Sequence, residues 1–294
     1  MARSTFSHSR LSAFETCPRK YFFRYIEGLE SRDETIEAFL GKQVHAVLEW
    51  LHTEVQAKRV PPLDAALARF HAEWDRGQAE AAAKGIAIRI VREGDTAASY
   101  VALGERCLTG YHKRYQPFDG VEVVGIEMRL EAPLDADGTH WMTGIADRVS
   151  RVREGVYEIR DYKTGRWVPS QGELDQDRQL ALYQYALHRL YPDAVEVHLV
   201  WNYLRHDREL RSRRTPQALD TLRADTLGLV LRVLERHAAV EGRRDDAAAV
   251  DAAFPTVTGR LCDWCEWKPI CPAFGAPPEA ARKAATRPGF LFPT

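Results

Sequence analysis

The chain has 294 residues, and its 41 basic and 42 acidic side chains give a net charge of −1. This balance excludes a strong overall field for nucleic acid, so any such binding must come from local patches. No apolar run reaches the ~18 residues of a membrane span, and residues 1–10 lack the apolar stretch of a secretory signal. We therefore expect a globular protein of the cytoplasm without membrane contact.

The first part of the chain, residues 1–117, predicts helices. Residues 34–53 carry apolar side chains at a helical period, and residues 63–83 and 94–115 follow the same pattern. A further helix is predicted over residues 9–25, with Pro18 near its middle or at a break.

The pattern changes to strands after Pro117. We expect strands over residues 121–130, 141–152, 156–163 and 194–204, and helices over residues 174–190 and 216–240. A meander followed by a helix and a returning strand favours an α/β fold, in which helices flank a mixed central sheet. This core, residues 118–240, is expected to form one integrated unit with the helical part and a C-terminal cysteine-rich segment and tail, residues 241–294.

Two short segments carry the chemistry. Asp161 and Lys163 are two apart on one predicted strand, so their side chains leave the same face, and Asp147 lies on the neighbouring strand. Carboxylates at such a place suit a hard cation such as Mg²⁺ or Mn²⁺, which activates water and neutralises phosphate charge. A lysine beside them stabilises the transition state of phosphodiester cleavage. The alternative is a surface salt bridge between Asp161 and Lys163.

The order of these motifs resembles the PD-(D/E)XK nuclease superfamily, and most closely RecB-like nucleases, including AddB and CRISPR-associated RecB-like exonucleases. The resemblance rests on G-x-x-D ending at Asp147, D-x-K-T-G from Asp161, and Q-x-x-x-Y from Gln179 to Tyr183, over about residues 9–271. It implies a restriction-endonuclease-like fold. It also implies a metal site made by His45, Asp147, Asp161 and the Tyr162 carbonyl, with Lys163 as the catalytic lysine and with Gln179 and Tyr183 beside the DNA. The alternative for Gln179 and Tyr183 is a place at the edge of the core.

Four cysteines carry a second motif. Cys262, Cys265 and Cys271 are spaced C-x2-C-x5-C, and Cys17 lies far upstream. In the resemblance, this arrangement holds a structural [4Fe–4S] cluster that links the two chain ends. Structural zinc is the alternative, since four cysteines also form a tetrahedral site. Cys107 has no place in the pattern and is expected to be a buried helix residue.

Basic residues offer candidate contacts for DNA. Arg19 and Lys20 lie among aromatic residues after Cys17, in a region that the resemblance places near the DNA, so we expect them to meet phosphates. A cluster of arginines is either a basic patch or a solvated loop: Arg205, Arg208, Arg211, Arg213 and Arg214.

The chain is therefore predicted to be a RecB-like exodeoxyribonuclease that prefers single strands. It contains no G-x-x-x-x-G-K-[ST] loop and hence no helicase motor of that kind, which leaves a helicase, a repair protein or a CRISPR complex as a possible partner. The alternative is a DNA-binding or scaffold subunit of a repair, recombination or CRISPR adaptation complex. A third hypothesis, a helical adaptor protein stabilised by zinc, does not account for the strand motifs.

Overall fold

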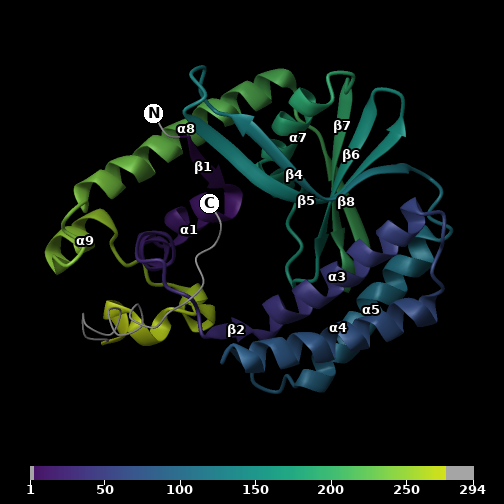
Figure 1. Cartoon of the computed structure of the whole chain (residues 1–294), viewed down its shortest axis with the longest axis horizontal. Helices are drawn as coiled ribbons and strands as arrows, with labels where there is room; N and C mark the ends of the chain where they lie inside the picture. The colour runs from purple at the N-terminus through teal and green to yellow at the C-terminus, as the bar shows by residue number, and fades with distance from the viewer. Residues whose placement is uncertain (1–2, 276–294) are drawn as a thin grey trace.

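A computed structural model describes residues 3–275, and it has an α/β architecture in which helices cover both faces of a mixed sheet (Figure 1). The expected fold class is confirmed. In the figure, α3, α4 and α5 form a group beside one side of the sheet, while α8 runs along another. The predicted tail beyond Gly275 lies outside the described residues. Within residues 3–275, no helix is both long and apolar enough to cross a membrane.

The sheet is built around one long strand, β5. Its strands are β1 (Ser4–Ser7), β4 (Glu122–Pro133), β5 (His140–Arg153), β6 (Val156–Lys163), β7 (Glu196–Tyr203) and β8 (Arg208–Ser212). β4, β5 and β6 form an antiparallel meander, β7 runs parallel to β6, and β8 is antiparallel to β7. β1 was not predicted, and it pairs in parallel with the first four residues of β5.

The N-terminal helices differ in one respect from the prediction. The single helix expected over residues 9–25 is divided into α1 (His8–Thr16), α2 (Pro18–Tyr21) and a π-helical turn (Phe22–Ile26). Cys17 separates the first two with an extended backbone, φ −159° and ψ 106°. The cause is Pro18, because a proline disfavours the helical conformation in the residue before it.

The other N-terminal helices follow the predicted periodicity. They are α3 (Ile36–Gln56), α4 (Leu63–Ala83) and α5 (Ala97–Tyr115), and a small parallel pair, β2 (Asp33–Thr35) with β3 (Ala87–Arg89), joins their ends. Thr35 and Thr96 cap α3 and α5 with their side chains.

The prediction of one helix over residues 174–190 is wrong at its N-terminal end. The structure has α6 (Gln171–Leu174) and α7 (Arg178–Leu190), because the Asp177 side chain accepts a hydrogen bond from the backbone N–H of Leu180 and caps α7 there. α8 (Pro216–Ala239) agrees with the prediction, whereas α9 (Ala247–Ala253), in the C-terminal segment, was not predicted. Three 3₁₀ turns follow: Arg260–Trp264, Lys268–Ile270 and Pro272–Phe274.

Two hydrophobic cores lie on the two sides of the sheet. One joins α1, α7 and α8 to Ile159 and Trp201, and it reaches Trp267 near the C-terminal end. The other joins α3, α4 and α5 to Tyr162. Consecutive residues of β6 therefore face different cores, and side chains from both layers meet where this strand ends.

Candidate functional site

The candidate site lies where β5 and β6 separate. Their last registered pair is Arg148 with Arg160, and the continuation of this register sets Asp147 opposite Asp161. Backbone pairing stops there, and the Asp147 Oδ2 atom instead accepts a hydrogen bond of 2.7 Å from the Tyr162 N–H. A carboxylate thus replaces the missing strand partner, and its other oxygen stays available.

His45 reaches this point from the middle of α3, as predicted. Its Nε2 lies 2.8 Å from the Tyr162 carbonyl oxygen, and its Nδ1 lies 3.5 Å from Asp147 Oδ1. Burial acts to lower the pKa of His45, but the hydrogen bond and charge of Asp147, with the charge of Asp161, raise it to about 9. The imidazolium therefore balances the carboxylates here, and a metal ion would compete with its proton.

Glu127 on β4 joins the same cluster, although it was not predicted as a site residue. Its neighbours Ile126 and Met128 pair with residues 148 and 146 of β5, so Glu127 lies opposite Asp147 on the adjacent strand. One ligand atom from each of Glu127, Asp147 and His45 lies within 4.8 Å of the others. Its φ of +45° is unusual for a non-glycine residue and marks a local distortion of the strand. Glu127 is the exposed member of the cluster, and partial desolvation with the charge of Asp147 raises its pKa to about 7.

Asp161 and Lys163 form the second half of the site, on one face of β6 as predicted. Lys163 Nζ lies 3.0 Å from Asp161 Oδ1 and 2.8 Å from Oδ2, but Oδ2 is buried and has no hydrogen bond among the described residues. Burial raises the pKa of Asp161 to about 6. The positive charge of Lys163 opposes this rise, and the negative charge of Asp147 adds to it. Burial lowers the pKa of Lys163, but the charge of Asp161 raises it further. Lys163 is therefore held protonated beside a carboxylate whose charged form is disfavoured by burial.

The predicted pair on α7 lies next to this lysine. Gln179 Oε1 is 3.4 Å from Lys163 Nζ, and Gln179 Nε2 is 3.4 Å from the Tyr183 hydroxyl. Tyr183 is only 5% exposed, and a Cβ at Gly144 would lie 2.2 Å from its ring. A side chain at Gly144 would thus displace the Tyr183 ring, and the Tyr183 hydroxyl accepts a hydrogen bond from Gln179. Contact of either residue with DNA stays a prediction.

Arg19 and Lys20 both form ion pairs, Arg19 in a buried position and Lys20 in a partly exposed one. Arg19 is 6% exposed and forms an ion pair with Asp251, while Lys20 Nζ lies 2.9 Å from Glu266 Oε2. Both charges are matched by carboxylates of the C-terminal segment. They tie the chain ends together in this structure rather than being free for phosphate.

The predicted cysteines come from segments that pack on each other. The backbone N–H of Arg19 bonds to the Pro255 carbonyl, and the rings of Phe23 and Trp267 lie 6.1 Å apart. Burial raises the pKa of the Cys265 thiol, and the nearby Cys17 adds to this rise. Within residues 3–275, no three of the four sulfurs approach within 4.8 Å of one another. Cys107 is buried in α5, as expected.

The arginine cluster is largely paired. Arg211 contacts Glu158 and Glu209, Arg213 contacts Glu196, and Arg214 donates to the Leu174 and Asp177 carbonyls. Arg208 and Arg211 lie on β8, a strand that the sequence did not suggest. These contacts organise the edge of the sheet and argue against one continuous basic patch.

Comparison with known proteins agrees with this geometry. The family model described as PD-(D/E)XK nuclease superfamily matches residues 5–272, almost the whole described chain. No curated protein sequence matches. Nucleases of this superfamily act on DNA with divalent ions such as Mg²⁺ or Mn²⁺.

Proposed function

The chain belongs to the PD-(D/E)XK nuclease superfamily, and from this premise we propose that it is a RecB-like exodeoxyribonuclease that prefers single strands. The observation that carries the proposal is the convergence of His45, Glu127 and Asp147 beside the ion pair of Lys163 with the buried Asp161. A scaffold role would not require this arrangement, since partly buried, poorly compensated carboxylates destabilise a fold.

The donor set fits Mg²⁺ or Mn²⁺. Carboxylate and carbonyl oxygens with one imidazole suit hard divalent ions. His45 Nε2 and the Tyr162 carbonyl are 2.8 Å apart, near the ~3.0 Å between adjacent ligands of an octahedral ion with bonds of about 2.1 Å. Asp161 Oδ2 is a buried oxygen that lies 2.8 Å from Lys163 Nζ and has no hydrogen bond within residues 3–275. We assign the ion to His45, Asp147, Asp161 and the Tyr162 carbonyl, and add Glu127 directly or through water.

An ion held by these residues would supply an acidified water and would neutralise charge on the scissile phosphate. Lys163 then donates hydrogen bonds to the attacking water or to a phosphate oxygen as negative charge develops. Asp161 and Gln179 fix the Lys163 ammonium from two sides, which limits its motion before the reaction. His45 must give up its proton to bind the ion, so metal binding releases a proton at neutral pH.

We also propose that Cys17, Cys262, Cys265 and Cys271 hold a [4Fe–4S] cluster that staples the chain ends. The support is that the segments carrying Cys17 and Cys265 pack on each other, and that the charge of Cys17 adds to the raised pKa of the Cys265 thiol. Four thiolates can hold either such a cluster or one zinc ion, and the metal assay below distinguishes the two. The ion pairs of Arg19 with Asp251 and of Lys20 with Glu266 hold the Cys17 segment against the C-terminal segment, which favours such a shared site.

The test uses anaerobically purified protein, an iron and zinc assay, and end-labelled linear and circular single-stranded DNA with Mg²⁺ or Mn²⁺. We expect brown protein with about four irons, digestion of linear DNA only, and a loss of roughly 10²-fold or more in Lys163→Ala. Lys84→Ala, an exposed lysine at the end of α4, is the matched control. Cutting that persists in Lys163→Ala refutes the site, and wild-type protein that binds DNA without cutting indicates a scaffold subunit.

A further inference from the structure

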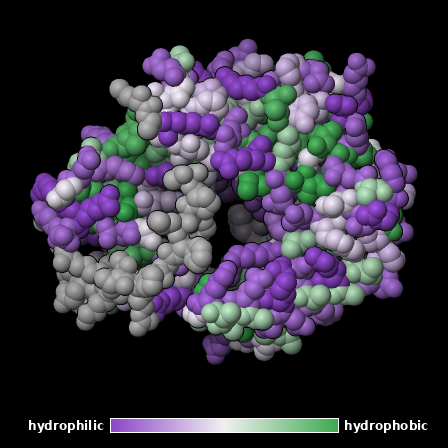
Figure 2. Space-filling model, in the orientation of Figure 1, coloured by the Kyte–Doolittle hydropathy of each residue, from purple (hydrophilic) through white to green (hydrophobic). Residues whose placement is uncertain are grey.

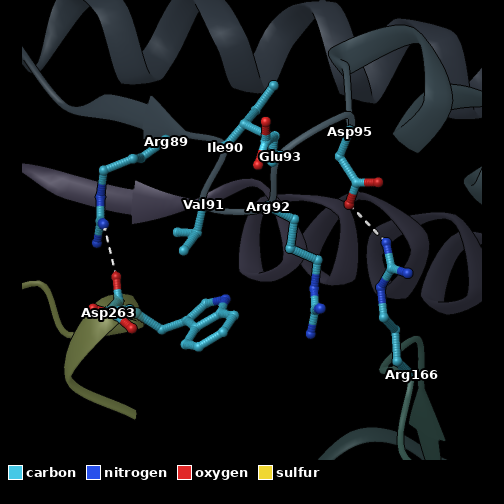
Figure 3. A pocket seen from close by; sticks show the side chains of 9 residues that line it. Arg89, Ile90, Val91, Arg92, Glu93, Asp95, Arg166 and Asp263 are labelled. Carbon is cyan, nitrogen blue, oxygen red and sulfur yellow. Dashed lines mark hydrogen bonds and ion pairs between the residues drawn. The ribbon is translucent and has the colours of Figure 1, made fainter. Parts of the chain in front are cut away.

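A groove of about 660 Å³ lies between the α4–α5 connection and the first cysteine-bearing turn (Figure 3). It is lined by Arg89, Ile90, Val91, Arg92, Glu93, Asp95, Arg166, Asp263 and Trp264. The face shown in Figure 2 is hollowed near its centre, between the sheet and the α3–α5 helices.

Two bridges hold the walls of the groove. Arg89 Nη1 donates to the Asp263 carbonyl at 3.0 Å, and Arg166 Nη2 donates to Asp95 Oδ2 at 2.6 Å. Figure 3 shows Arg92 extending into the space between these bridges. Its nearest carboxylate partner among the described residues is Glu37 at 3.8 Å. Arg92 is therefore the arginine of the groove with the most freedom to bind a ligand.

The charges of the groove balance, so stacking rather than net charge must attract a ligand. Three arginines face three carboxylates, those of Glu93, Asp95 and Asp263. Trp264 is partly exposed, and the Arg92 guanidinium lies 5.3 Å from the centre of its ring. Trp167, which follows Arg166 in the chain, is 72% exposed. Exposed tryptophans beside an arginine form a typical platform for stacked bases.

Chain connectivity and hydrogen bonds link the groove to the elements that carry the candidate active site. Arg166 lies three residues after Lys163, and its partner Asp95 shares the Tyr100 hydroxyl with Glu37 in the first turn of α3. Eight residues of α3, or about 12 Å at ~1.5 Å per residue, separate Glu37 from His45. A bound strand would thus run along the N-terminal half of α3 toward the scissile position.

We propose that this groove binds unpaired nucleotides of the DNA strand that enters the active site, with a base stacked on Trp264 and a phosphate at Arg92. The strand must be unpaired, because bases in a duplex already stack on both sides and present no free face. This inference rests on the proposed nuclease function and assigns its substrate path. It also makes the cysteine-bearing segment a wall of that path.

The test measures binding of a fluorescein-labelled oligothymidylate by the intact protein, without added Mg²⁺ or Mn²⁺, across a range of salt concentrations. Trp264→Ala should weaken binding about tenfold or more, whereas Trp264→Phe keeps a stacking face and should bind like wild type. Arg92→Ala should weaken binding and lower the slope of log affinity against log salt by about 0.7. Arg232→Ala, on the exposed side of α8, is the matched control.

Arg92 lies far in sequence from the cysteines, so its variant separates strand binding from damage to the cysteine segment. Wild-type binding in both Trp264→Ala and Arg92→Ala overturns the groove, even if cutting still depends on Lys163. Equal loss of duplex binding in these variants overturns the requirement for unpaired bases. Groove-dependent binding without any cutting would instead refute the nuclease activity and leave the groove standing.

Discussion

The arrangement of the site predicts that Asp161→Asn stabilises the metal-free protein while it removes activity. Asp161 is 5% exposed, and its burial outweighs the favourable charge of Lys163. A rise of its pKa from 3.8 to about 6 corresponds to at most about 3 kcal/mol at ~1.36 kcal/mol per unit. Asparagine has a similar shape and carries no charge, so it avoids this cost.

The sign of the pH dependence follows from proton binding. Between pH 3.8 and about 6 the folded carboxyl holds its proton and the unfolded one does not, so stability falls as the pH rises through this window. The full penalty is present above about pH 6. The stabilising effect of Asp161→Asn should therefore be absent below pH 4 and reach its maximum above pH 6.

The assay is urea unfolding of both proteins at several pH values, with and without Mg²⁺. An ion at a hundred times its dissociation constant would add about 2.7 kcal/mol to the wild type, and little to the variant. Glu209→Gln is the opposite control, because the charge of Arg160 and hydrogen bonds from Tyr115 and Arg160 hold the pKa of Glu209 at about 2 despite its burial. This control should lose stability at neutral pH. A metal-free Asp161→Asn variant that is less stable than wild type at pH 8 would refute the reasoning.

Three further predictions concern other parts of the fold. Gly144→Ala should cost ~1–3 kcal/mol in urea unfolding and slow cleavage, since its Cβ would overlap the Tyr183 ring, and Tyr183→Ala in the same chain should recover stability. Burial, with the charges of nearby arginines, lowers the pKa of His237 to about 4, so stability should fall as the pH drops from 6.5 toward 4; His237→Gln should flatten this change by about 1–2 kcal/mol, discounted for partial exposure, and an unchanged profile would exclude it as the source. Cys262→Ser should lower iron content and melting temperature together, whereas Cys107→Ser should leave iron content unchanged; equal iron in both variants contradicts the cluster.

The sequence predicted the elements whose pattern is local. The periodicity of α3 and α4 and the alternation along β6 were sufficient, because each reflects one buried face of one element. The same parity placed Asp161 and Lys163 on one side of β6, where the structure has them. The helix break at Cys17 was harder to predict. Pro18 indicates a break, but only the backbone conformation of the structure gives its position.

Glu127 could not be selected from the sequence for a different reason. It is an acid within a strand of otherwise mixed pattern, and nothing in that pattern distinguishes it from Glu131 on the same strand. Glu131 pairs with Arg3 and Arg129, whereas Glu127 reaches His45 and Asp147. The difference depends on the register between β4 and β5 and on a positive φ, and both are properties of the assembled sheet.

The site itself depends on a strand that no local pattern predicts. β4 occupies one edge of β5, so β1 and β6 must share the other edge, where β1 pairs with residues 140–143 and β6 with residues 148–153. Residues 144–147 are left between them, and Gly144 and Asp147 are the two ends of this interval. The glycine admits Tyr183, and the aspartate turns toward Tyr162 and His45. Four residues of β1 thus define the gap at which Asp147 turns toward His45, and we infer that the proposed metal site depends on incomplete pairing of a single strand edge.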